Sequence, residues 1–247
     1  MNKLKKIDFY LHLFVNCYIN HNQLMAELIK IYNGEHLVKM YFENDGKKEG
    51  EYLSYYHDGK LMSTCNYIND KREGEFRLYF DTGQLNVTYN YVDGKKEGEY
   101  RSYYRSGELN EIYNFINDKA EGEYRSYHRN GQLYEIYNYI NNKIEGKYKS
   151  YFDNGQLFET YNYINNKMEG KYKSYYQNGQ LDIIRTYVAG KVEGEHKKYH
   201  YNGELYITCY CVNDKIEGKY KSYCRNGQLI ETCMFINGNK IIKSVYI

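Results

Sequence analysis

The sequence predicts an all-β protein: an elongated, single-layer antiparallel β-meander built from hairpin repeats. Eight Glu-Gly dipeptides recur with a 24-residue period, from Gly50 to Gly218. Nine residues after each of these glycines stands another glycine, and a leucine follows two residues later. No insertion breaks the phase, so each unit is expected to stack on its neighbours in one register.

Each unit is predicted to contain two hairpin turns. Asn130-Gly131 lies between two runs rich in Tyr, Ile and Leu. Asn-Gly there is the strongest short hairpin signal, because both residues of such a two-residue turn need a positive φ. The second turn falls at Asn141-Asn142, and Asn tolerates the left-handed region. We therefore expect about seventeen strands, spanning about 80 Å at ~4.8 Å per strand.

Two-residue turns would fix the register and therefore the two faces of the sheet. With such turns, Tyr124 lies opposite Tyr137, and Tyr137 lies opposite Gly146 across the next turn. One face is then expected to carry Tyr124, Ser126, His128, Leu133, Tyr137 and Tyr139. The other face is expected to carry Arg125, Tyr127, Ile136, Asn138 and Ile140.

The residues expected to hold the repeats together are glycines with a tyrosine opposite, where the ring covers bare backbone. We expect the inward tyrosines and leucines to be more buried than Tyr127. Hydrogen exchange should open first near the units with Cys65, Arg185 or Cys209 in the tyrosine position, and last around residues 89–175. The predicted structural set comprises Gly98, Gly122, Gly146, Gly170, Tyr89, Tyr113, Tyr137, Tyr161, Leu133 and Leu157.

The chain divides into three parts in sequence. Residues 1–36 form an N-terminal cap or a degenerate repeat, residues 37–241 the repeat domain, and residues 242–247 a C-terminal strand end. The segment 22–32 (NQLMAELIKIY), closed by Asn33-Gly34, predicts a short capped helix. The alternative is a degenerate repeat, in which Cys17-Tyr18-Ile19-Asn20 precedes Asn33-Gly34 and Leu37.

Composition excludes several classes of protein. The 247 residues carry 34 Lys+Arg and 32 Asp+Glu, a net charge of +2, which gives no electrostatic reason to expect duplex nucleic acid or an anionic membrane as the partner. The six cysteines show no disulfide-framework spacing and fit a reducing compartment. A basic start followed by the apolar run 7–15 superficially resembles a signal peptide, but Asp8 and His12 interrupt it. An intracellular, cytoplasmic location is expected.

No residues are expected to form a catalytic, cofactor or metal site. Cys209, Cys211, Cys224 and Cys233 could suggest zinc, but each replaces an inward tyrosine of the repeat and is expected to be buried there. His196 and His200 likewise replace tyrosines, and four residues along a strand separate them by about 13 Å. We expect satisfied histidines rather than metal ligands.

The recurring glutamates are also expected to be structural. A paired-carboxylate hydrolase needs one unique pair in differing environments. Eight equivalent glutamates, each close in sequence to a lysine such as Lys71 or Lys95, instead predict cross-strand charge ladders. A catalytic site would need residues that differ from one unit to the next, whereas the units here keep the same residues. We therefore expect no enzymatic activity.

The repeated pattern N-x-K-x-E-G-x-Y-x-x-Y followed by N-G-x-L, as in residues 141–157, resembles the MORN repeat family. The likeness covers roughly residues 37–238 and is to the shorter variant found in bacterial antitoxin-like proteins and in large DNA viruses of amoebae. Trp is missing and Glu-Gly stands alone, whereas the standard repeat uses Trp and a Gly-x-Gly pair. The resemblance implies an elongated twisted sheet used for scaffolding and protein contact. Rich use of Asn, Lys, Ile and Tyr, all with AT-rich codons, suggests an AT-rich genome such as that of a giant virus.

The expected function is that of a non-enzymatic repeat scaffold, which mediates protein–protein interaction through an extended sheet face. One alternative is a peripheral membrane adaptor that associates with phospholipid, since lipid association is claimed for some members of the family. Another is an antitoxin-like neutraliser of a partner protein. Tyr interleaved with basic residues, as in Tyr124-Arg125-Ser126-Tyr127, could stack single-stranded nucleic acid. Alternating acidic residues make that partner unlikely, and tyrosines on both faces are what a thin sheet needs. In a virus, the location would be the host cytoplasm.

Overall fold

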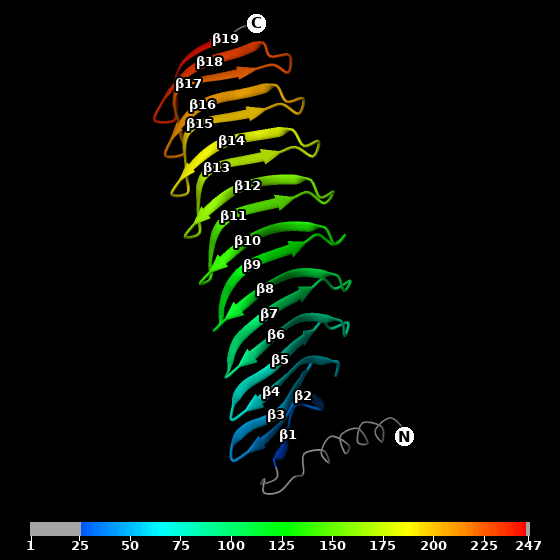
Figure 1. The fold of residues 1–247 in the computed structure, drawn as a ribbon. Coiled ribbons are helices and arrows are strands. Elements are labelled where there is room, and N and C mark those ends of the chain that lie inside the picture. Colours follow the sequence, from blue (N-terminus) through cyan, green and yellow to red (C-terminus); the bar gives the residue numbers. More distant parts are fainter. Residues whose placement is uncertain (1–25, 246–247) are drawn as a thin grey trace.

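The computed structural model describes residues 26–245, which form one open antiparallel sheet of 19 strands (Figure 1). The strands are β1 (Glu27–Asn33), β2 (His36–Asn44), β3 (Lys47–Tyr55), β4 (Leu61–Ile68), β5 (Lys71–Tyr79), β6 (Leu85–Val92), β7 (Lys95–Tyr103), β8 (Leu109–Ile116), β9 (Lys119–Tyr127), β10 (Leu133–Ile140), β11 (Lys143–Tyr151), β12 (Leu157–Ile164), β13 (Lys167–Tyr175), β14 (Leu181–Val188), β15 (Lys191–Tyr199), β16 (Leu205–Val212), β17 (Lys215–Tyr223), β18 (Leu229–Ile236) and β19 (Asn239–Val245).

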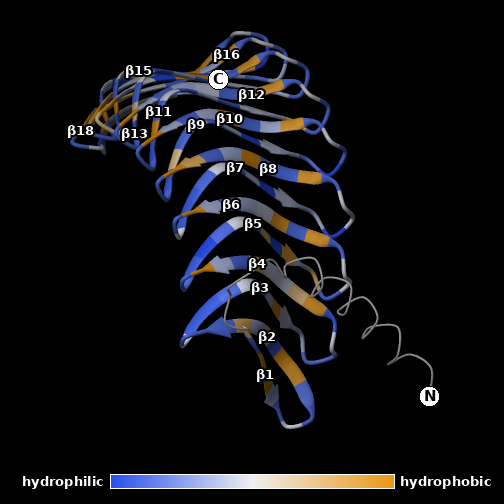
Figure 2. Cartoon of the chain, turned by 60° about the horizontal axis from the view of Figure 1, so that its bottom comes forward, coloured by the Kyte–Doolittle hydropathy of each residue, from blue (hydrophilic) through white to orange (hydrophobic). Residues whose placement is uncertain are grey.

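Each strand from β2 to β18 pairs with the strand before it and the strand after it, and β1 and β19 are the two edges, so the described chain runs as a continuous meander. Figure 1 shows the strands succeeding one another along a long ladder, and Figure 2 shows that the strands are bent and the sheet twisted. The predicted fold class is confirmed. Between residues 26 and 245 there is no helix that could cross a membrane.

The predicted N-terminal helix is wrong where the structure describes it. Residues Glu27–Asn33 form β1, which pairs with β2 from Glu27↔Glu43 to Asn33↔His36. The β-branched Ile29 and Ile31 fit a strand, and the neighbouring strand supplies hydrogen bonds that an isolated helix of this length would have to make alone. The remaining residues of the predicted helix, 22–25, and Cys17-Tyr18-Ile19-Asn20 of the alternative lie outside the described residues.

The two turns of each unit have different geometries. Asn141 and Asn142 have φ of 49° and 65°, the type I′ hairpin turn that was predicted. At Asn130-Gly131 the predicted two-residue turn is wrong, because only Gly131 has a positive φ, of 81°. The Gly131 N–H donates to His128 O at 2.9 Å, and the His128 N–H donates to Gln132 O at 2.8 Å. This is a three-residue loop, a type I turn followed by a left-handed glycine.

The longer loop moves one predicted face residue to the opposite side of the sheet. The three-residue loop places Leu133 opposite Tyr127, and a bulge between Leu133 and Glu135 then restores the expected pairing of Tyr137 with Tyr124. Directly opposed residues of an antiparallel pair share a face. Leu133 therefore lies on the face of Tyr127, and Leu157 shares the face of Tyr151 in the same way.

A second irregularity explains the glycine of each Glu-Gly pair. The β10–β11 ladder jumps from Ile136↔Lys149 to Asn138↔Glu145, so Tyr137 is not paired with Gly146. Gly146 has a φ of +78°, and a Cβ built on it would meet nothing within 4 Å. The prediction that the Tyr137 ring lies opposite Gly146 and covers its bare backbone is wrong. The bulge needs glycine because its backbone is left-handed, and Gly98, Gly122 and Gly170 share this geometry.

Candidate interaction surface

One face, here called the tyrosine face, is held together by a column of aromatic rings, one from each strand from β5 to β13. Successive ring centroids are 4.5 to 5.9 Å apart, a separation at which aromatic pairs attract. The column is the main packing element of a sheet that has no second layer. It runs through Phe76, Tyr89, Tyr100, Tyr113, Tyr124, Tyr137, Tyr148, Tyr161 and Tyr172.

Six phenol hydroxyls of this column have hydrogen-bond partners within the sheet. Tyr148 donates to Glu135 at 2.8 Å, and Tyr172 donates to Glu159 at 2.7 Å. The hydroxyls of Tyr137 and Tyr139 lie 3.1 Å apart and share a hydrogen bond. Burial, together with the Glu159 carboxylate, raises the pKa of Tyr172 to about 12. These groups are satisfied by their neighbours, which fits a structural role.

The predicted structural residues fall into two groups. Tyr89, Tyr137 and Tyr161 are only 6 to 8% exposed, and Tyr113 is half-buried. Tyr124 and Tyr137 are more buried than Tyr127, as expected. Leu133 and Leu157 are half-buried like Tyr127, on the opposite face from the column, so the expected burial of Leu133 beside Tyr137 is wrong. The recurring leucine therefore belongs to the bulge after the hairpin loop and does not pack in the tyrosine column.

The column is interrupted where Arg185 pairs with Tyr172. The guanidinium carbon lies 4.8 Å from the Tyr172 ring and 5.0 Å from the Tyr187 ring, a cation–π arrangement. Its Nε is buried without a hydrogen-bond partner. On the next strand, burial and then the nearby Arg185 charge lower the pKa of His196. An unpaired buried donor is costly, so this pair is a weak point of the column.

The tight-turn edge is held by the recurring glutamates, which corrects the predicted charge ladder. Glu145 Oε2 accepts a hydrogen bond at 2.7 Å from the backbone N–H of Asn165, the first turn residue of the next unit. The lysine instead reaches the turn itself, since Lys143 Nζ donates to Asn165 Oδ1 at 3.1 Å. The same glutamate contact occurs in all eight units, from Glu49, Glu73, Glu97, Glu121, Glu145, Glu169, Glu193 and Glu217.

The second turn residue completes this contact between units. The Asn142 N–H donates to Ala120 O at 3.0 Å, and Asn142 Oδ1 accepts from the Ala120 N–H at 2.5 Å. Five of the eight units use Asn or Asp at this position, a side chain that both tolerates a positive φ and accepts a hydrogen bond, and the other three have glycine. Each turn is fixed to the unit before it by backbone and side-chain bonds.

The opposite edge is joined by a different set of contacts. Tyr104 donates to Tyr127 O at 2.6 Å, and His128 and His200 use Nε2 in the same way, each 2.9 Å from the carbonyl of Tyr151 and Tyr223. His200, which was predicted to be satisfied in a tyrosine position, is so, and His128 makes the same contact.

The cysteines follow the prediction with one exception. Cys65, Cys209, Cys211 and Cys233 are buried free thiols, whereas Cys224 is exposed. Cys224 follows the end of β17, at a position where longer side chains reach the next unit and a thiol is too short. Within residues 26–245 no three His, Cys, Asp or Glu side chains gather as a metal site would require.

An exposed aliphatic row lines the tight-turn edge. The residue before each of the eight tight turns from Asn69 to Gly238 is a β-branched Ile or Val, and each is between 39 and 52% exposed. Neighbouring members belong to alternate strands, so they repeat about every 9.6 Å. Figure 2 shows orange apolar segments recurring from strand to strand. The aliphatic row consists of Ile68, Val92, Ile116, Ile140, Ile164, Val188, Val212 and Ile236.

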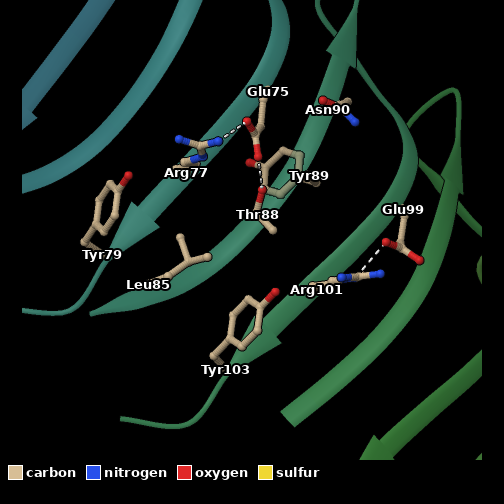
Figure 3. Close-up of a pocket in the computed structure, with 10 residues that line it drawn as sticks. All are labelled: Glu75, Arg77, Tyr79, Leu85, Thr88, Tyr89, Asn90, Glu99, Arg101 and Tyr103. Atoms are coloured by element: carbon tan, nitrogen blue, oxygen red, sulfur yellow. Dashed lines mark hydrogen bonds and ion pairs between the residues drawn. The ribbon is translucent and has the colours of Figure 1, made fainter. Parts of the chain in front are cut away.

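The face opposite the tyrosine column, here called the charged face, carries a shallow groove between β5 and β7 (Figure 3). Acids and bases pair within it: Glu75 lies 2.6 Å from Arg77, and Glu99 lies 2.7 Å from Arg101. Thr88 on β6 donates to Glu75 at 3.1 Å. Tyr79, Leu85 and Tyr103 form the apolar end of the groove.

Comparison with family models gives a match to the MORN repeat variant. The matched residues are 48–69, 72–93, 96–117, 120–141, 144–165, 168–189 and 216–237, more than half of the chain. No curated protein matches the chain significantly.

Among solved structures, the crystal structure of TcdB2-TccC3 is similar at 10% identity and a TM-score of 0.22, over 88% of this chain. This chain corresponds to 15% of the length of that one. The GtfA/B complex bound to UDP and GlcNAc is similar at 12% identity and a TM-score of 0.17, over 59% of this chain and 25% of that one.

Proposed function

The chain belongs to the MORN repeat variant family, and from this premise we propose that it is a non-enzymatic scaffold that binds a protein partner along one face of its sheet. The repeated side-chain contacts support this proposal. The recurring glutamates and the turn asparagines bond to backbone N–H groups of neighbouring units, and column tyrosines such as Tyr148 bond to other side chains of the sheet, so these groups are occupied in holding the sheet together.

The observation that carries the proposal is the aliphatic row. Single exposed apolar residues are ordinary on a protein surface, but a regular row of eight along one edge is an organised apolar surface. Covering such side chains contributes about 25 cal/mol per Å² of apolar area removed from water. A long partner could use several members of the row at once, and its affinity would increase with each.

The experiment uses the full chain as bait in an extract of the cells that express it. The quadruple variant Ile116→Glu, Ile140→Glu, Ile164→Glu and Val188→Glu disrupts the centre of the row. A control variant, Lys30→Glu with Lys39→Glu, changes exposed positions on β1 and β2. We expect a protein that binds the native chain and the control but not the quadruple variant, and that binds again when purified. Equal capture by all three chains would refute a scaffold that works through this row.

A peripheral membrane adaptor is the second candidate, favoured by one observation. Seven of the eight aliphatic residues pair with a lysine across the tight turn, as Ile140 does with Lys143, whereas Ile236 pairs with Asn239. Alternating apolar and basic side chains suit the boundary of an anionic bilayer. Flotation with vesicles containing phosphatidylserine tests it: native chain should float and the quadruple variant should not, whereas a native chain that stays at the bottom would exclude this function.

We also propose an intracellular location. The support is chemical: four free thiols are packed inside the sheet, and an oxidising compartment would favour disulfides. Fluorescent tagging of the full chain, followed by imaging and fractionation, tests this location.

A further inference from the structure

The residues that line the groove in Figure 3 recur three units further along the chain, with the charged positions changed. Adding 72 to each residue number gives the same tyrosines, leucine, threonine and asparagine, since Tyr79, Leu85 and Thr88 become Tyr151, Leu157 and Thr160. The four charged positions change from two glutamates and two arginines to four lysines. We call these the lysine window: Lys147, Lys149, Lys171 and Lys173.

The pairing of the strands places the four lysines together on the charged face. Thr160 on β12 pairs with Lys149 on one side and Lys173 on the other, and Asn162 pairs with Lys147. The two lysine-bearing strands are thus about 9.6 Å apart, with β12 between them. Along each strand the two lysines are two residues apart, so they project to the same side about 6.8 Å from one another.

In the lysine window no acid compensates these charges. The structure gives ion pairs at the equivalent positions of other units, between Glu75 and Arg77, Glu99 and Arg101, and Glu195 and Lys197, but none for any of the four lysines. Lys147 and Lys171 are exposed, and Lys149 and Lys173 are partly exposed. Like charges at this spacing repel one another, and a bound anionic ligand would relieve this repulsion.

The neighbourhood of the window favours a peptide over other anions. Paired Glu123–Arg125 on β9 and Glu195–Lys197 on β15 close the window on both sides, so the basic area is two lysine-bearing strands wide. Nucleic acid and membranes are usually bound by longer basic surfaces. Next to the lysines, half-buried Tyr151 and Tyr175 offer apolar contact, the combination found in protein interfaces.

We propose that the lysine window binds an acidic, extended segment of a protein partner. Lys147, Lys149 and Tyr151 lie at alternate positions of one strand face, and same-side residues of an extended peptide have that spacing. The complementary segment carries two carboxylates at alternate positions followed by an apolar residue. This inference rests on the proposed scaffold function and names the chemistry of its partner.

The test uses the full chain and a fluorescein-labelled peptide, Gly-Glu-Ser-Glu-Ser-Leu-Gly, with binding followed by fluorescence anisotropy. The key variant is Lys147→Glu, Lys149→Arg, Lys171→Glu and Lys173→Arg, which installs the charged residues of the β5–β7 groove and so uses a combination this fold already contains. We expect it to weaken peptide binding at least about tenfold, as the loss of several exposed ion pairs implies.

The matched control is Lys30→Glu with Lys39→Glu, which lowers the net charge by the same amount far from the window. It should bind the peptide like the native chain. The reciprocal variant Glu75→Lys, Arg77→Lys, Glu99→Lys and Arg101→Lys should gain a second site. Equal binding by the native chain and the key variant, or no binding by the native chain, would overturn the proposal.

Other anions are separate arms of the same experiment. A single-stranded oligonucleotide or vesicles with phosphatidylserine that bind more tightly than the peptide, and are lost in the key variant, would overturn the peptide assignment. Capture of a partner through the aliphatic row does not use these lysines, so that experiment can succeed when this one fails. The two failures are therefore distinguishable.

Discussion

Replacing Gly146 distinguishes two explanations for the recurring Glu-Gly pair. If the left-handed backbone at φ +78° is the reason for glycine, Gly146→Ala should cost about 1–2 kcal/mol, the penalty of placing an L-residue in that region. Gly146→Asn should cost less than Gly146→Ala although Asn is larger, because Asn tolerates this conformation. Open space around the Cβ position leaves room for both side chains.

The assay must be local, because a long repeat array need not unfold in one step. Hydrogen exchange followed by mass spectrometry reports the opening free energy of the peptide that spans β11, and urea denaturation supplies a second value. Lys147→Ala, at the exposed neighbouring position, is the control and should change stability by less than about 0.5 kcal/mol. If Asn proves more destabilising than Ala, crowding rather than backbone conformation governs this position.

Three further predictions follow from the contacts of the sheet. Glu145→Ala should destabilise the next turn by about 1 kcal/mol and speed hydrogen exchange of the Asn165 amide. Glu145→Gln keeps a hydrogen-bond acceptor and should have a smaller effect. Unchanged exchange of that amide in the alanine variant would contradict the contact. Cys224→Ser should remove one fast-reacting thiol in an Ellman assay at pH 8, because Cys224 is exposed, whereas burial raises the pKa of Cys209 to about 12; an unchanged fast phase would show that Cys224 is protected. Tyr172 has a folded-state pKa of about 12 against about 10 in the unfolded chain, so the folded state holds the phenol proton more tightly. The free energy of unfolding should therefore fall as the pH rises from 10 to 12. Unfolding monitored by circular dichroism at a series of pH values checks this, and constant stability across that window would refute it.

The sequence predicts the fold through features that are local and repeated. The 24-residue period and the tight turn at Asn141-Asn142 determine a meander, and the structure has both. The turn at Asn130-Gly131 shows the limit of this reasoning. Asn-Gly suits two turn geometries that differ by one residue, and only hydrogen bonding across the loop decides between them. That single residue moves Leu133 to the other face.

The roles of the glutamate and glycine could not be predicted, because both depend on contacts between units. Glu145 accepts a hydrogen bond from a backbone amide twenty residues later. Every residue in the turn has such an amide, so the pattern of side chains does not identify this partner. A regular ladder would place Tyr137 opposite Gly146, whereas the structure has a bulge there. The segment 22–32 contains helix-forming residues, but its residues from Glu27 onward form β1. They do so because β2 pairs with them, and only the folded sheet supplies that partner.

The lysine window is visible in the sequence only after alignment of the units, because composition alone conceals it. The whole chain has a net charge of +2, and basic and acidic residues alternate along most units. Once the register places Lys149 and Lys173 on either side of Thr160, the local charge differs from the average. The candidate surface therefore required the structure, although each of its residues stands in the printed sequence.

The contacts at the tight-turn edge have a direction that bears on how the chain is synthesised. The acceptor, such as Glu145, always precedes the amide that it holds, such as that of Asn165. On the ribosome each emerging hairpin therefore meets a template that is already ordered, and docking it closes a loop of only about twenty residues. The sheet can grow in the order of translation, with the same local step at the eighth unit as at the second.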